Sequence, residues 1–362
     1  MHPGRRWLYH KVFGVGVVGL CIYFPTSFYL ADTMEENGKT FGPYAVVQTL
    51  ELMPFNILSR FAGSVASSEY LPPPVHHKLI EYYCKMYDVD LTHAAVPGSS
   101  GVAHAQIEDY PTMQAFFTRE LVNGARKVDT SASVVSPCDG TLLRCGEVGA
   151  DNLLVQVKGC TYSMHNLLRA QLPIPANSIT LNKSSTDNNI DLSKKTKRLF
   201  FSFHLGPADY HRFHAPVDFE VRESILMPGL LYPVMRSATK WFPMLYVNNE
   251  RVAIHGPIKG KKGEVSGGPN QRHVGIALVG ALNVGSVSLF FDERVRSNLS
   301  DPPSYAVHRQ YSEKVAPWLT KGQPMGMFRM GSSIVMVMDV AADQEIQVNQ
   351  GDKVQMGQCL VR

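Results

Sequence analysis

The sequence predicts a mostly β fold, of the β-rich α+β class, with a single barrel-like or sandwich-like catalytic domain behind N-terminal helices and one transmembrane helix. Short runs rich in Val, Ile, Leu and Phe are separated by Gly, Pro and Asn turns, which is the pattern of β-strands. The runs are residues 134–135, 153–157, 199–203, 274–279 and 286–291. Residues 76–89 instead carry apolar side chains at helical spacing, so we expect an amphipathic helix there, entered through an extended segment at 70–75.

The N-terminus contains an uncharged run with the length of a membrane span. Residues 12–31 follow a basic segment and carry no charged side chain. At about 1.5 Å per residue, a helix of this length crosses roughly the 30 Å hydrocarbon core of a bilayer. The run is too long for an ordinary signal peptide. We therefore expect a basic N-terminus and transmembrane helix in residues 1–31, a linker in 32–75, and a catalytic domain in 76–362.

Length, charge and cysteine content restrict the class of protein. The chain has 362 residues, a formal net charge of +4 and no evident repeat, so one sizeable core is expected after the N-terminal part. This charge is too small to indicate a nucleic-acid partner, although a mild excess of base suits an anionic lipid surface. The six cysteines form no C-x-x-C pair and no zinc-type spacing with histidines. We predict neither a metal site nor a disulfide framework.

The tetrapeptide Met330-Gly331-Ser332-Ser333 has the composition of a self-cleavage site. A glycine before a hydroxyl residue permits strained backbone conformations, and strain favours attack on the peptide by a side-chain oxygen. Attack by Ser332 on the Gly331 carbonyl would give an ester, and β-elimination from that ester would leave a pyruvoyl group where the serine had been. Gly-Ser-Ser is also a common turn sequence, so this interpretation depends on partner residues elsewhere in the chain.

Two upstream segments supply the partners that a serine nucleophile requires. A serine hydroxyl needs a base to take its proton, and the base works best when a third group orients it. His211 and His214 lie in a short segment bracketed by prolines, which favours an extended stretch over a helix. Asp139 lies in a Pro-x-Asp-Gly turn ahead of a predicted strand. Asp139, His211, His214 and Ser332 are therefore the candidate catalytic residues, although each residue type also has ordinary structural roles.

The chain resembles phosphatidylserine decarboxylases in several blocks that follow the order of that family. The blocks are residues 110–126 (YPTMQAFFTRELVNGAR), 136–140 (SPCDG), 157–162 (VKGCTY), 209–216 (DYHRFHAP), 249–252 (NERV), 279–286 (VGALNVGS) and 322–333 (GQPMGMFRMGSS). The resemblance covers about residues 70–362. The usual cleavage motif of the family is Leu-Gly-Ser-Thr, where this chain has Met330 and Ser333 at the outer positions. Residues 204–207 (HLGP) and Cys138 also depart from the usual pattern, whereas the Gly-Ser pair is kept.

The resemblance implies a reaction and a role in it for each candidate residue. Self-cleavage between Gly331 and Ser332 would give a β chain ending at Gly331 and an α chain beginning with the pyruvoyl group, which remain associated as a heterodimer. His214, oriented by Asp139, would take the Ser332 proton. The pyruvoyl ketone would then form a Schiff base with phosphatidylserine, accept the electrons freed as carbon dioxide leaves, and yield phosphatidylethanolamine, with His211 as the candidate acid.

The lipid substrate that the resemblance implies also predicts where the protein is located and what it binds. A diacyl lipid stays in the bilayer, so the enzyme must work at a phospholipid membrane. The basic start ahead of one span suits a single-pass protein of the mitochondrial inner membrane, as in mitochondrial members of the family. The endoplasmic reticulum or another endomembrane is the alternative location.

Two other functional classes use some of the same features. A serine hydrolase would keep Ser332 as a free nucleophile with His214 and Asp139, but the sequence lacks the G-x-S-x-G motif. A non-catalytic, membrane-anchored lipid-binding relative would keep the fold and lose a catalytic group. Three polar stretches, residues 177–197, 259–272 and 298–321, are expected to form surface loops.

Overall fold

The computed structural model describes residues 55–68, 71–149, 153–155, 161–179, 195–232, 234, 244–259, 268–281, 286–329 and 332–362. The predicted transmembrane helix at residues 12–31 and much of the predicted linker lie outside these residues. Among the helices that are described, none combines the length and apolar character needed to cross a membrane.

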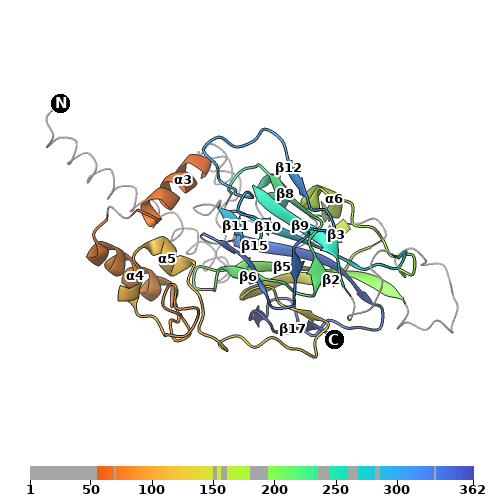
Figure 1. Ribbon diagram of the computed structural model, residues 1–362, viewed down its shortest axis with the longest axis horizontal. Coiled ribbons are helices and arrows are strands. Elements are labelled where there is room, and N and C mark those ends of the chain that lie inside the picture. The colour runs from red at the N-terminus through yellow and green to blue at the C-terminus, as the bar shows by residue number, and fades with distance from the viewer. Residues whose placement is uncertain are drawn as a thin grey trace, which may run out of the picture.

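An eight-stranded antiparallel sheet organises the catalytic domain (Figure 1). Its spatial order is β12-β8-β9-β10-β15-β5-β2-β16. In that order the strands are Val307–Gln310, Glu223–Met227, Arg251–Pro257, His273–Val279, Ser332–Ala341, Thr196–Leu205, Gly140–Glu147 and Lys353–Val354. The strand that begins at Ser332 is therefore central, with β10 on one side and β5 on the other.

Side chains of β15 alternate between two apolar cores, because successive residues of a strand point to opposite faces. Ile334 and Met336 enter the sandwich core, and Val335 and Val337 enter the helix-side core. Every residue of β15 before Ala341 is buried. A strand that is covered on both faces reads as a continuous apolar run, which explains the unbroken hydrophobic sequence after Ser333.

The sandwich core lies between the large sheet and a three-stranded sheet of order β11-β14-β6. These strands are Val287–Leu289, Pro324–Phe328 and Arg212–His214. Phe213 and Phe328 of the small sheet share this core with Phe203 and Ile334 of the large one. Two short pairs close its margins: β1 (Val134–Val135) with β17 (Cys359–Val361), and β7 (Phe219–Glu220) with β13 (Trp318–Leu319).

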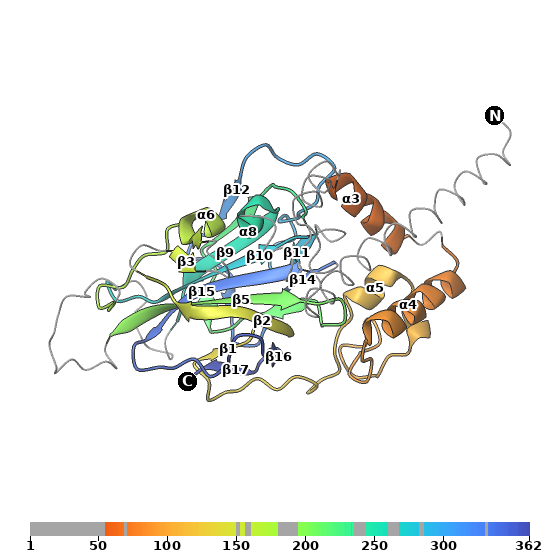
Figure 2. The ribbon, with the colours of Figure 1, turned by 180° about the vertical axis from the view of Figure 1, so that it is seen from behind.

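The helix-side core lies on the other face of the large sheet. It is covered by α6 (Met164–Leu168), α8 (Leu245–Asn248) and the hairpin of β3 (Leu153–Val155) and β4 (Thr161–Ser163). Figure 2 shows α6 and α8 beside β9 and β10. The helices α3 (Phe55–Ala66), α4 (Pro73–Tyr87) and α5 (Met113–Phe117), with the 3-10 turn η1 (Ile107–Asp109), gather at one end of the sheet instead (Figure 1).

The mostly β class, the helix expected at 76–89 and the predicted strands, where they are described, are confirmed. The helix runs from Pro73 to Tyr87, so the extended segment expected at 70–75 is wrong for residues 73–75, because the first turn of a helix tolerates proline without losing a hydrogen bond. The 298–321 stretch is not only a loop, because it contains β12 and β13. Both are short strands that pair with distant segments, so their local sequence carries little strand signal. Most of the other two polar stretches lies outside the described residues.

Candidate active site

Ser332 is the first residue of β15, paired with Leu205 of β5. Its position in the alternation of the strand matches that of Ile334 and Met336, so its side chain faces the sandwich core. Ser332 is fully buried, and its Oγ has no hydrogen-bond partner among the described residues. An unsatisfied buried hydroxyl costs about 1–3 kcal/mol, and the Oγ atoms of Ser333 and Ser202 share this condition.

Because of the same alternation, the side chain of Ser333 points to the opposite face of the sheet from that of Ser332. It lies on the face of Val335 and Val337, in the helix-side core. There it is close enough to Tyr246 to lower the pKa of that phenol, which burial raises. The two adjacent serines therefore face different environments, and Ser332 faces the sandwich core.

The chain crosses from one sheet to the other just ahead of Ser332. β14 ends at Phe328 in the small sheet, and β15 begins at Ser332 in the large one. The small sheet also contacts the segment ahead of β2, where the His214 amide of β6 donates to the Pro137 carbonyl at 2.8 Å.

His214 lies on β6 with both ring nitrogens engaged. Nδ1 is 2.9 Å from the Gly322 carbonyl oxygen, and Nε2 is 3.2 Å from the Tyr210 hydroxyl. Because a carbonyl only accepts, Nδ1 carries the proton and Nε2 keeps its lone pair. Burial lowers the pKa of His214, so the ring is neutral near neutral pH and can act as a base.

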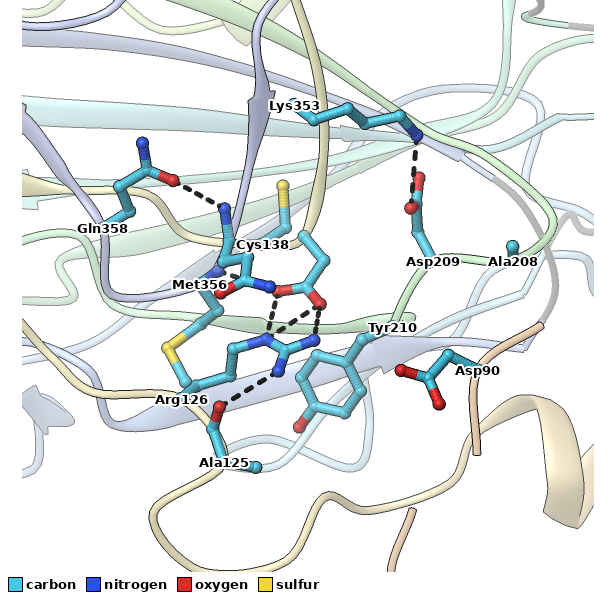
Figure 3. A network of polar contacts seen from close by, with 12 residues as sticks. Asp90, Ala125, Arg126, Cys138, Ala208, Asp209, Tyr210, Lys353, Met356 and Gln358 are labelled. Atoms are coloured by element: carbon cyan, nitrogen blue, oxygen red, sulfur yellow. Dashed lines mark hydrogen bonds and ion pairs between the residues drawn. The ribbon is translucent and has the colours of Figure 1, made fainter. Parts of the chain in front are cut away.

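Asp139 does not bind His214 directly, contrary to the expected arrangement. Its carboxylate accepts from Arg126 Nε at 3.1 and 3.0 Å and from Arg126 Nη2 at 2.6 Å (Figure 3). The Met356 amide donates to the same carboxylate at 2.8 Å. Within the described part of the chain, the orientation of His214 therefore comes from the Gly322 carbonyl. Asp139 acts on His214 through its charge, which raises the pKa of the imidazole against the effect of burial.

His211 is fully buried and stacks on Phe117, with ring centroids 4.1 Å apart and an interplanar angle of 22°. Neither of its ring nitrogens has a hydrogen-bond partner among the described residues. Burial holds the pKa of His211 well below its ordinary value, and the nearby charge of Arg119 lowers it further. The backbone carbonyls of Gly206 and Pro207 lie close enough to act on the pKa in the opposite direction, but burial dominates and His211 is a neutral imidazole.

Sequence reasoning missed three residues of this site. Arg126 is the ion-pair partner of Asp139, and Tyr210 is the hydroxyl on His214. Arg119 is buried beside His211, donates from Nη2 to the Ala208 carbonyl at 3.1 Å, and keeps an unpartnered Nε. Arg119 and Arg126 belong to the 110–126 block, which contributed to the family resemblance but predicted no role for either arginine.

Comparisons with known proteins show which family the chain resembles in sequence. A sequence model of the family described as phosphatidylserine decarboxylase matches residues 113–362. The chain is 29% identical to the mitochondrial phosphatidylserine decarboxylase proenzyme 1 of Oryza sativa subsp. japonica, over 89% of this chain and 80% of that protein. It is 29% identical to the mitochondrial phosphatidylserine decarboxylase proenzyme of Rattus norvegicus, over 87% of this chain and 74% of the relative. It is 31% identical to the phosphatidylserine decarboxylase proenzyme of Marinobacter nauticus, over 79% and 85% respectively.

Proposed function

We propose, because this chain belongs to the phosphatidylserine decarboxylase family, that Ser332 is the residue from which it makes its catalytic group. The protein is an enzyme that decarboxylates phosphatidylserine and is made as a proenzyme. The bond that is cut lies between Gly331 and Ser332. The observation that carries this assignment is the position of Ser332 at the start of β15, where its buried Oγ has no partner among the described residues and faces the sandwich core, whereas the equally buried Ser333 Oγ faces the other core.

Self-cleavage begins with removal of the Ser332 proton. The neutral His214 is the base, because its Nε2, 3.2 Å from the Tyr210 hydroxyl, keeps a lone pair that can take a proton. Ser332 Oγ then attacks the Gly331 carbonyl, and the Gly331–Ser332 C–N bond breaks to give an ester with a free Ser332 amine. β-Elimination releases the Gly331 carboxylate as the end of the β chain, and hydrolysis of the remaining dehydroalanine leaves the pyruvoyl group and ammonia. A buried imidazolium is costly, and the charge of Asp139, fixed in place by Arg126 and the Met356 amide, stabilises it.

The α chain stays in place after the cut because of its position in the sheet. β15 carries residues 332–341 and forms antiparallel ladders with β10 on one side and β5 on the other. Its side chains fill both cores. Releasing it would expose this apolar surface, so the two chains remain a heterodimer.

The buried Ser332 position fits a pyruvoyl group, which, when formed, supplies a ketone that binds the substrate amine and accepts the electrons released with carbon dioxide. The residues around it supply orientation and protons. Arg119, buried without a carboxylate partner among the described residues, fits an anionic group of the substrate. An anion next to His211 would raise its pKa, so the imidazole gains a proton when substrate binds and can donate it to the carbon that has lost its carboxyl group.

Several relatives are named as mitochondrial, which supports a mitochondrial location. Residues 12–31 have the length and composition to anchor the protein in the inner membrane as a single span. An anchored enzyme reaches a substrate that stays in the bilayer. The membrane and its phosphatidylserine are therefore its partners.

Intact-mass measurement tests the cleavage site. The purified protein should consist of two fragments that separate between Gly331 and Ser332, with a C-terminal fragment blocked to N-terminal sequencing. Ser332→Ala should stay uncut and inactive. Ser333→Ala is the matched control, because its side chain faces the other core, and it should be cut. A fully active single chain with an unmodified Ser332 would instead favour the hydrolase class.

A further inference from the structure

A carboxyl group that the mechanism above does not use lies directly ahead of β9. Glu250 belongs to the 249–252 block, precedes β9, and is only 5% exposed. Its backbone carbonyl accepts from the Gly280 amide at 2.9 Å, and its own amide donates to the Leu230 carbonyl at 2.7 Å. The backbone of Glu250 thus continues the large sheet by one residue beyond β9.

Glu250 and Ser332 lie in one row across this sheet. Arg251 pairs with Val279, and Val279 pairs with Ser333. Continuing the register by one residue gives the row Glu250, Gly280, Ser332. Residues in one row point to the same face of the sheet. Glu250 is two residues from Val252, whose side chain is in the sandwich core, so the Glu250 side chain points to that face as well. Both side chains therefore face the same layer, and the residue between them is a glycine, which has no side chain to separate them.

The spacing leaves room for one nitrogen atom. Opposed residues of antiparallel strands have Cα atoms about 4.5–5.5 Å apart, so two steps make about 10 Å. A Glu side chain reaches up to about 5 Å from its Cα, with bonds of about 1.5 Å. If the Glu250 side chain leans toward Ser332, about 5 Å remains, and a bent path through one nitrogen, with a hydrogen bond of about 2.9 Å and an approach of about 3 Å between reacting atoms, spans it.

The surroundings of this carboxyl leave it able to bind a cation. Oε1 accepts from the Asn298 amide at 2.9 Å, in the segment that borders β11. Arg60 of α3 lies within electrostatic range but forms no ion pair with Glu250 in the described residues. Arg251, the next residue, donates to backbone carbonyls such as that of Leu167, on the helix side. A nearly buried carboxylate without a cation in contact is costly, and a bound ammonium group would offset that cost.

We propose that Glu250 receives the ammonium group of the substrate and takes one proton from it, so that the amine reaches the group formed at residue 332 with a free lone pair. This inference rests on the proposed function. One N–H bond breaks with its electron pair left on nitrogen, and one O–H bond forms at the carboxylate, so the charges of both groups disappear together. The carboxyl releases the proton to water before the next turnover.

The raised pKa of the Glu250 carboxyl supports this proton transfer. Burial raises the pKa of Glu250 to about 7, while the Asn298 amide and the charge of Arg60 act in the opposite direction. A carboxyl with this pKa is partly ionised at neutral pH, and it holds a proton from an ammonium group better than an ordinary carboxylate does. The proton acceptor should therefore become active as the pH rises through about 7.

Covalent trapping tests the proposal without relying on turnover. Glu250→Gln keeps an oxygen that can accept from Asn298 but removes the charge, and we expect it to be cut like the unaltered protein. Cut protein is mixed with short-chain phosphatidylserine and cyanoborohydride, and the mass of the α chain is followed. At pH 7 the adduct should form about 10²-fold more slowly in Glu250→Gln, the effect of losing a proton-transfer group. The rise of the rate with pH should be lost as well.

Two controls separate this role from a structural one. Methoxyamine is neutral at pH 7 and needs no proton acceptor, so it should react with both proteins at rates within about 2-fold. Glu223→Gln makes the same substitution in β8, where Glu223 pairs with His255 at the far end of the β8–β9 ladder, and it should trap phosphatidylserine normally. Glu250→Asp, which keeps the charge, should recover part of the rate.

The outcomes decide between the proposals. Equal trapping of phosphatidylserine by Glu250→Gln and the unaltered protein would overturn the inference, as would an equal loss with methoxyamine, which indicates a distorted site. An uncut Glu250→Gln protein would move this carboxyl into self-cleavage and also overturn it. If the unaltered protein is neither cut nor active, the proposed function fails, and this result is distinct from all of the others.

Discussion

Replacement of Arg126 by methionine tests whether the Arg126–Asp139 pair holds the site together. The two side chains are 13% and 8% exposed and form three short N–O contacts. Arg126→Met keeps most of the apolar stem but leaves Asp139 with the Met356 amide as its remaining hydrogen-bond donor among the described residues. Removing one partner of a buried ion pair costs about 3–5 kcal/mol, because the other charge stays buried without compensation.

The expected effect is therefore large enough for routine measurement. At about 2–4 °C per kcal/mol, the melting temperature should fall by roughly 6–20 °C. Self-cleavage, followed by gel mobility at a temperature where the variant is folded, should also slow, because Asp139 no longer has a fixed position near His214. Arg362→Met removes a partner of Asp129 in a pair whose arginine side chain is 57% exposed, and it should change neither quantity noticeably.

A second substitution separates stability from chemistry. Adding Asp139→Asn to Arg126→Met removes the uncompensated charge, so the melting temperature should recover in part. Cleavage should stay slow, because the charge that stabilises the His214 imidazolium is gone. If Arg126→Met alone melts and cuts like the unaltered protein, the pair has no role in holding the site. If the double variant cuts normally, Asp139 has no electrostatic role in the reaction.

Three further predictions concern the histidines and the anchor. His214→Ala should accumulate uncut precursor, whereas His211→Ala should be cut at least partly and then release carbon dioxide about 10²–10⁴-fold more slowly per cut molecule, and the reverse pattern would exchange the two roles. Burial lowers the pKa values of His211 and His214 below their ordinary value of about 6.5, so both rings are neutral in the folded protein. The unfolded chain binds these protons more readily, so the free energy of unfolding should decrease as the pH falls below about 6.5. A melting temperature that is constant from pH 7 to pH 5 would contradict this. Deletion of residues 1–31 should release the protein from carbonate-washed membranes without preventing cleavage, and continued retention would refute a single span.

The mostly β fold class could be predicted because its signals are local. Short Val-rich and Phe-rich runs between turns predicted β5 and β10 of the large sheet and β1, β3 and β11 elsewhere. The Gly-Ser pair indicated a cleavage site, which stays a prediction, and the long apolar run after it forms the central strand at 332–341. The ordered blocks indicated the family without any knowledge of contacts. Asp139, His211 and His214 were selected by residue type and local context, and their roles remain predictions.

The partners of these residues depended on tertiary structure alone. His214 is oriented by Gly322, which lies 108 residues away in the chain, and Asp139 is held by Arg126 and by Met356, which is 217 residues away. Such contacts are set by strand order and register, which periodicity within a segment does not encode. For the same reason the sequence expected Asp139 to bind His214, and it gave Glu250 no role. The sequence determined which chemical groups the chain carries, and the pairing of β9, β10 and β15 decided that Glu250 and Ser332 share a face, because two residues become neighbours in a sheet only through the strands between them.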